Sequence, residues 1–173
     1  MNIIKSIEEL NAMKLKGGGI IPFAKNNGKT YFLLGKEAPD PFWKEANHWS
    51  CFGGAIEEKN NLVGIVREFW EETNGIFGSE KNILEFIKKN FSKLFVITNG
   101  IGATIFIQVN YDPYLVDYYR NTYNFMKDIM TVKRKGLLEK DEIKWFKKSD
   151  FHKYKLRKNM EYIIECVKKS KFF

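Results

Sequence analysis

Three glutamates, Glu68, Glu71 and Glu72, are spaced so that a helix would bring their carboxylates onto one face. A helix advances about 100° per residue, so positions i, i+3 and i+4 are neighbours on its surface. Carboxylates packed this closely repel one another unless a cation compensates. Carboxylate oxygens are the ligands that Mg²⁺ and Mn²⁺ prefer. The spacing therefore predicts a divalent metal site on a helix, with a solvated acidic face as the simpler alternative.

The residues around the glutamates indicate a separate apolar face on the same helix. This face would be formed by Leu62, Ile65, Val66, Phe69 and Thr73. The carboxylates should therefore point away from the core. Gly64 falls on the acidic side, where a glycine costs roughly 1 kcal/mol relative to alanine. Room for a ligand or a metal is one reason for a glycine there.

Around these glutamates the sequence resembles the Nudix hydrolase family. The motif of that family, the Nudix box, opens with glycine, continues to Arg-Glu-x-x-Glu-Glu and closes with glycine. The segment Arg67–Glu72 matches the core of the box, within a variant box that runs from Gly53 to Gly75. The predicted strands before and after the box fit the architecture of the family. The resemblance implies an α/β fold, an α/β/α sandwich with a mixed sheet between helices.

The resemblance also implies a reaction. Nudix hydrolases cleave a diphosphate bond in a nucleoside diphosphate linked to another moiety, with Mg²⁺ or Mn²⁺ as the cofactor. By this resemblance Glu68, Glu71, Glu72 and the carbonyl of Gly54 are candidate metal ligands. Arg67 would orient one of the carboxylates. One of the three glutamates, or an acid of the preceding loop, would act as the base.

The sequence departs from the Nudix box in two places. The segment from Gly54 to Arg67 is one residue shorter than in the family, so the expected loop glutamate falls at Lys59 or Asn60. Glu57 or Glu58 could replace it. The closing glycine comes one residue late, at Gly75, which only moves the end of the helix. The shortened loop keeps an alternative open, namely a catalytically weak Nudix-fold module that binds nucleotide or RNA.

Length and composition fit one Nudix domain over residues 1–173. Hydrophobic residues make up 44% of the chain, which argues against disorder. No apolar run approaches the roughly 18 residues of a membrane span, and the N-terminus has no signal-peptide core. We therefore expect a cytoplasmic protein without membrane contact. Cys51 and Cys166 are expected to be buried free thiols, and the oligomeric state is not predicted.

The chain is basic, with a formal net charge of +8 and a pI near 9.3. The C-terminal third carries the densest positive charge, at Lys127, Lys133, Arg134, Lys135, Lys140, Lys144, Lys147, Lys148, Lys153, Lys155, Arg157 and Lys158. Such charge attracts polyanions, so RNA is a candidate partner and a solvated basic surface is the alternative. The composition and the Glu-Glu-Thr ending of the box are similar to those of Nudix proteins of large DNA viruses, some of which remove mRNA caps. A viral protein would act in the host cytoplasm.

Alternating patterns predict the remaining elements. Strands are expected at 17–24, 31–35, 49–52, 94–97, 103–109 and 142–146, and further helices at 80–90, 114–130 and 159–169. Phe42, Trp43 and Trp49 lie in or beside the loop 37–47, where aromatic rings either stack on a base or pack in the core. Glu142 opens an acidic-then-Trp strand of a kind that often follows the Nudix box. We assign these four residues as candidate substrate contacts.

Overall fold

The computed structural model describes residues 1–131 and 136–173. Within them the strands are β1 (Asn2–Ile3), β2 (Gly17–Asn26), β3 (Lys29–Glu37), β4 (Trp49–Ser50), β5 (Phe52–Ala55), β6 (Phe95–Thr98), β7 (Gly102–Gln108) and β8 (Lys140–Lys147). The helices are α1 (Ile7–Ala12), α2 (Asn61–Glu72), α3 (Glu80–Asn90), α4 (Leu115–Ile129) and α5 (Met160–Lys169), with short 3-10 turns η1 (Phe91–Lys93) and η2 (Lys148–Lys153).

The strands form one mixed sheet in the order β1-β6-β7-β2-β3-β4, with β5 also paired to β2 and β8 to β3. β2 runs parallel to β7 and antiparallel to β3 and β5. The β2–β3 hairpin turns through Asn27 and Gly28, whose φ angles of 49° and 70° are those of the tight turn that the sequence predicts. The expected α/β sandwich with a mixed sheet is confirmed.

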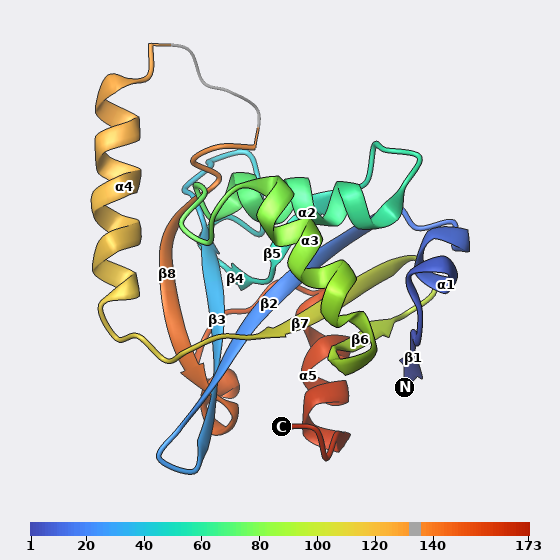
Figure 1. Ribbon diagram of the computed structural model, residues 1–173. Helices are drawn as coiled ribbons and strands as arrows, with labels where there is room; N and C mark the ends of the chain where they lie inside the picture. The colour runs from blue at the N-terminus through green and yellow to red at the C-terminus, as the bar shows by residue number, and fades with distance from the viewer. Residues whose placement is uncertain (132–135) are drawn as a thin grey trace.

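Both faces of the sheet are covered because side chains alternate along each strand. In β7, Ile105 and Ile107 belong to the core under α2, whereas Phe106 belongs to the core under α5. Helices α2 and α5 therefore lie on opposite faces, and α4 stands beside β8 at the sheet edge (Figure 1). This arrangement puts the glutamates of α2 and the residues of α5 on different sides of the same strands.

Helix α2 has the apolar face that the sequence predicts, since all five residues of that face are buried. Its first turn is capped by the Asn60 side chain, which accepts a hydrogen bond from the Val63 amide at 3.1 Å. At its other end Asn74 and Gly75 both have left-handed φ angles, of 50° and 71°. The Gly75 amide donates to Trp70 O and the Asn74 amide to Glu71 O, which is the Schellman pattern. The late glycine thus extends the helix end without moving the glutamates.

Most predicted elements are present with small changes in their ends. Residues 80–90 form α3 as expected, and α4 lies within 114–130. The short elements α1 and β1 were not predicted, because a two-turn helix and a two-residue strand leave little periodic signal. β8 begins at Lys140, two residues before the predicted strand. In residues 1–131 and 136–173, no helix is both long and apolar enough to cross a membrane.

Candidate active site

Arg67 lies at the centre of the acidic site. Its guanidinium contacts three carboxylates, with Nε 2.5 Å from Glu58 Oε1, Nη1 2.7 Å from Glu71 Oε2 and Nη2 2.8 Å from Glu68 Oε1. Of the two loop acids left open by the shortened loop, Glu58 is therefore the one that reaches Arg67. Nη2 also donates to the Ala55 carbonyl at 3.2 Å, which ties the loop to β5. One cation thus orders the loop and two of the three helix carboxylates.

Gly64 makes room for this loop. A Cβ at position 64 would lie 2.5 Å from Glu58 Oε2 and 2.9 Å from Ile56 Cγ2. The space beside Gly64 is thus filled by the loop, and our expectation that it is kept for a metal or ligand is wrong. The glycine instead lets the shortened loop dock on α2.

The side chains of the three helix glutamates are largely buried from solvent. Their exposed fractions are 9% for Glu68, 7% for Glu71 and 3% for Glu72, so the alternative of a solvated acidic face is wrong. Glycines cover two of them. A Cβ at Gly54 would lie 2.3 Å from Glu68 Oε2, and a Cβ at Gly136 would lie 2.2 Å from Glu71 Oε2. Backbone therefore approaches these carboxylates at distances that no side chain would allow.

Glu72 turns away from Arg67 and into the sheet. Its Oε2 accepts a hydrogen bond of 2.5 Å from the Gly53 amide, and its Oε1 lies 3.1 Å from Lys140 Nζ. Lys140 is fully buried and also contacts Glu37 and, at 2.8 Å, Ser50 Oγ. Lys140 is therefore not part of the basic surface that the charge pattern predicts. It is a buried partner of the Nudix-box helix.

Burial dominates the electrostatics of these carboxylates. It raises the pKa of Glu72 to about 8, although Lys140 and the Gly53 amide oppose the shift. Burial also raises the pKa of Glu68, with Arg67 acting against it. Burial alone would lower the pKa of Lys140, but Glu72 and Glu37 raise it above its ordinary value. Glu37 also pairs with Arg157 at 3.1 Å, so burial, opposed by Lys140, is the main cause of the raised pKa of Glu72.

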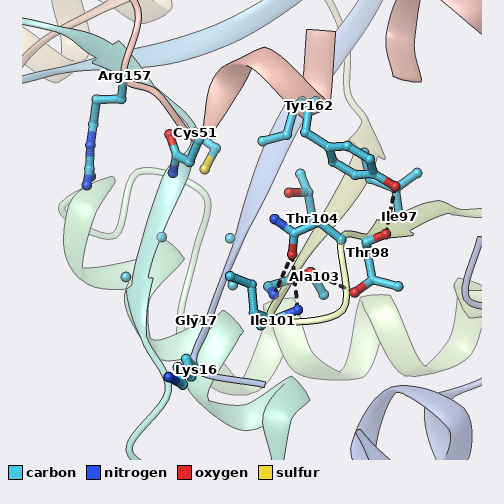
Figure 2. A pocket seen from close by; sticks show the side chains of 18 of the residues that line it. Lys16, Gly17, Cys51, Ile97, Thr98, Ile101, Ala103, Thr104, Arg157 and Tyr162 are labelled. Carbon is cyan, nitrogen blue, oxygen red and sulfur yellow. Dashed lines mark hydrogen bonds between the residues drawn. The ribbon is translucent and has the colours of Figure 1, made fainter. Parts of the chain in front are cut away.

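A cavity of about 410 Å³ lies on the opposite face of the sheet (Figure 2). Its floor is built from glycines of β2 and β5, including Gly53 and Gly54, where missing side chains leave the sheet hollow. Arg157 and Tyr162 line it from the α5 side, and the Tyr162 hydroxyl donates to Thr98 O at 2.7 Å. The same two glycines thus contact the acidic helix on one face and the cavity on the other.

The cavity also contains a thiol. Cys51 lines it, and burial raises its pKa to about 11. Cys51 and Cys166 are both buried and free, as the sequence predicts. A thiol with such a pKa is unreactive near neutral pH, so Cys51 contributes packing rather than chemistry.

The four candidate substrate contacts do not come together. Phe42 is 98% exposed, and Trp43 lies against Arg157, with the guanidinium carbon 4.8 Å from the ring centroid. Trp49 is buried against Phe146 at 5.0 Å between ring centroids, which favours core packing. Trp43 is therefore connected to the cavity through Arg157, while Trp49 packs on β8 through Phe146.

Glu142 belongs to another region. It contacts Lys36 at 3.3 Å and lines a second cavity of about 550 Å³ between α4 and β8, together with Tyr119 and Tyr123. The Tyr119 hydroxyl donates to the carbonyls of Glu72 and Lys140, at 3.0 and 2.8 Å, and so ties α4 to the end of α2. The sequence does not predict this contact, because nothing in the pattern of α4 distinguishes one tyrosine from the others.

The donor set fits a hard divalent cation by its chemistry, since it offers carboxylate and carbonyl oxygens and no soft ligand. Across residues 1–131 and 136–173, however, no three His, Cys, Asp or Glu side chains converge closely enough to hold a metal ion as they stand. Arg67 occupies the space between Glu58, Glu68 and Glu71. A cation bound between these carboxylates would therefore replace contacts that Arg67 now makes with them.

Comparison with known proteins identifies the class of fold. A Nudix hydrolase from M. smegmatis, RenU, has a TM-score of 0.54 at 15% identity, covering 90% of this chain and 84% of that one. A C. elegans Ap4A hydrolase in a binary complex has a TM-score of 0.49 at 17% identity, covering 89% and 95%. The similarity to RenU shows that the protein has the Nudix hydrolase fold.

Sequence comparison adds less. No family model matches the sequence. An uncharacterized protein of Acanthamoeba polyphaga mimivirus is 39% identical over 64 residues, which are 36% of this chain and 20% of that relative. The matched part of the chain thus spans about a fifth of the length of the curated relative.

Proposed function

We propose that this protein is a metal-dependent hydrolase that cleaves a diphosphate bond in a nucleoside diphosphate linked to another moiety. The observation that carries the proposal is the charge balance around Arg67. Among the described residues, this guanidinium faces the three carboxylates of Glu58, Glu68 and Glu71. Uncompensated, mostly buried charge is costly. A divalent cation would remove that cost, and the Nudix fold supports the same reading.

The proposed ligands are Glu68, Glu71, Glu72 and the Gly54 carbonyl, with Mg²⁺ or Mn²⁺ as the cation. When bound, such a cation lowers the pKa of water and neutralises charge that develops on the leaving phosphate. The protein supplies the rest. Arg67 orients Glu68 and Glu71, and Gly54 allows Glu68 to lie against the backbone. One of the helix glutamates, or Glu58 of the loop, would accept a proton from the attacking water.

The cavity on the α5 face is the proposed site for the nucleoside part of the substrate, because its lining includes Gly53 and Gly54, which also contact Glu72 and Glu68. Its volume of about 410 Å³ lies within the range of small-molecule sites, roughly 300–1,000 Å³. Trp43 beside the cavity can stack on a base, whereas the adjacent Arg157 guanidinium already pairs with Glu37 and Glu45, each at 3.1 Å. Capped RNA is one candidate substrate, because the surface charge of the protein favours a polyanion. Nucleoside triphosphates, dinucleoside polyphosphates and nucleotide sugars are the others.

A panel assay tests the proposal. Each substrate class is incubated with the protein and Mg²⁺ or Mn²⁺, and release of phosphorylated product is followed with and without chelator. Turnover that needs the cation and is lost in Glu71→Gln is the expected result. Glu85→Gln, an exposed glutamate of α3, is the matched control and should keep full activity.

The rival function is a Nudix-fold module that binds nucleotide or RNA without turnover. The present contacts of Arg67 favour it, because they satisfy Glu68 and Glu71 without a cation. Saturable nucleotide or RNA binding together with no product release from the whole panel would establish this function instead.

A further inference from the structure

A buried lysine reaches the acidic site from the neighbouring strand. Lys140 is the first residue of β8, and its register partner in β3 is Glu37. Its side chain is 0% exposed and contacts three acceptors, on Glu37, Ser50 and Glu72. An ammonium has three donor hydrogens. The Lys140 ammonium is therefore fully satisfied, which is what a buried lysine requires.

The surroundings of Lys140 are shaped for its stem. A Cβ at Gly35 would lie 2.9 Å from Lys140 Cγ and 2.9 Å from a ring carbon of Phe52. Gly35 does not have a positive φ, so the glycine matters here for the space it leaves. The missing side chain of β3 thus leaves room for the Lys140 stem beside Phe52.

Glu72 holds two elements together through this contact. One of its oxygens accepts a hydrogen bond of 2.5 Å from the Gly53 amide, and the other lies 3.1 Å from Lys140 Nζ. Gly53 belongs to β5 and is followed by Gly54, against which Glu68 lies. The position of the Glu72 carboxylate therefore affects the glycine segment as well as the helix.

We infer that Lys140 is a positioning residue of the active site, which holds the Glu72 carboxylate against the Gly53 amide and so fixes the Gly53–Gly54 segment relative to the helix glutamates. This inference rests on the proposed function for its effect on turnover. The alternative role is simpler. Lys140 would then only neutralise Glu37, and Glu72 would keep its place without it.

A pair of variants separates the two roles. Lys140→Met removes the charge and keeps the length of the stem; Glu37 keeps its contact with Arg157 at 3.1 Å, whereas Glu72 loses the ammonium that faces it. The double variant Glu37→Gln/Lys140→Met removes both members of the pair, and the net charge stays that of the wild type. Removing both partners of a buried ion pair is often close to neutral for stability, whereas removing one is not. The double variant should therefore fold even if Lys140→Met does not.

The decisive measurement is hydrogen exchange at the Gly53 amide, which needs no substrate. In the double variant we expect this amide to exchange at least tenfold faster than in the wild type, while the amide of Ile105 in central strand β7 stays protected. In Glu37→Gln alone, which keeps Lys140, Gly53 should stay protected. Lys144→Met makes the same substitution four residues further along β8. It should leave the exchange rates of both amides unchanged.

Turnover gives the second readout. On whichever substrate is cleaved, the double variant should lose at least tenfold in kcat with KM changed less than threefold. Wild-type protection of Gly53 in the double variant would overturn the inference, since Lys140 would then be only the partner of Glu37. If no substrate is turned over, the proposed function fails, while the exchange at Gly53 still decides whether Lys140 holds Glu72.

Discussion

Glu58 Oε1 lies 2.5 Å from Arg67 Nε, so the acid of the shortened loop contacts the arginine of the Nudix-box helix. The loop is one residue shorter than the family pattern, yet it keeps a carboxylate at this arginine. Gly64 permits the contact, because any side chain there would collide with Glu58. The absence of a side chain at Gly64 thus lets the loop pack directly on α2.

Replacing Glu71 or Glu72 by Gln should abolish most of the activity without unfolding the protein. Gln keeps the size of the side chain and a good helix propensity, but it removes the charge from a proposed ligand. We expect kcat to fall by about two orders of magnitude or more, the size seen when one group that stabilises the transition state is removed. Steady-state kinetics and circular dichroism check this result. Wild-type turnover in Glu71→Gln would refute the assignment of the metal site.

Divalent cations should stabilise the wild-type protein. A ligand that binds only the folded state raises stability in proportion to RT ln(1 + [L]/Kd). Millimolar Mg²⁺ or Mn²⁺ should therefore raise Tm in the wild type, and raise it much less in a variant with Gln at positions 68, 71 and 72. Thermal unfolding with a chelator provides the baseline. Equal shifts in both proteins would mean that the cation binds elsewhere.

Arg67→Met should destabilise the metal-free protein, because three carboxylates lose their common partner. The Arg67 side chain is 22% exposed, so solvent screening reduces the loss to about 2–3 kcal/mol. For a protein of this size that corresponds to a fall in Tm of roughly 5–10 °C.

A second substitution controls for the charge effect. Adding Glu58→Gln to Arg67→Met removes one of the repelling carboxylates, so part of the lost Tm should return. Mg²⁺ should restore more of the Tm lost in Arg67→Met at low ionic strength than at high ionic strength, where salt already screens the repulsion between the carboxylates. If Tm stays equally low in the double variant, the loss would come from packing of the arginine stem instead.

The metal-free protein should lose stability as pH rises through the neutral range. The Glu72 pKa is 4.5 as the ordinary value and about 8 in the folded protein. Between these values the folded state keeps a proton that the unfolded chain releases, so the free energy of unfolding falls with rising pH. At about 1.4 kcal/mol per pKa unit, the effect is on the order of a few kcal/mol. Glu68 acts in the same direction.

Urea unfolding at about pH 5 and pH 8 with chelator present measures this slope. Glu72→Gln cannot ionise at that position, so its stability should fall less between the two pH values. A wild type that is more stable at the higher pH, or equal slopes in the two proteins, would show that Glu72 ionises normally.

The basic C-terminal third should guide long RNA if capped RNA is the substrate. Lys147, Lys153 and Lys155 are exposed, and Lys153 contacts Asp150 at 2.8 Å. Seven residue steps along β8 separate Lys147 from Lys140, which is about 23 Å. Lys147 thus lies well away from Glu72, whereas Lys155 is nearer, since its carbonyl accepts a hydrogen bond from the Trp49 amide at 2.9 Å. Lys133, Arg134 and Lys135 lie outside the described residues.

Replacing Lys147, Lys148, Lys153 and Lys155 by Gln should flatten the salt dependence of RNA binding, because fewer counterions are released. The same variant should cleave long capped RNA more slowly and leave a free cap dinucleotide unaffected. Binding and turnover measured from about 50 to 200 mM salt check both effects. An unchanged salt slope and an unchanged ratio of long to short substrate turnover would favour a small nucleotide as the substrate.

The sequence by itself determined the helix, its apolar face and the spacing of the glutamates. These features depend on the 3.6-residue period and on contacts between near neighbours, which a sequence displays directly. It also determined the alternation that covers both faces of the sheet, as in β7, and therefore the sandwich. The family pattern around Arg67 pointed to the same fold.

Only the tertiary structure decided what the glutamates face. Glu72 meets Lys140 across 68 residues of chain, and a lysine in a strand with acidic neighbours reads as a solvent-exposed residue. Gly35 inside β3 is the one sequence signal for that contact, since a glycine within a strand often marks a close approach. The partner itself depends on which strands pair. Strand pairing is set by the packing of the whole sheet, so no local pattern could place Lys140 beside Glu72.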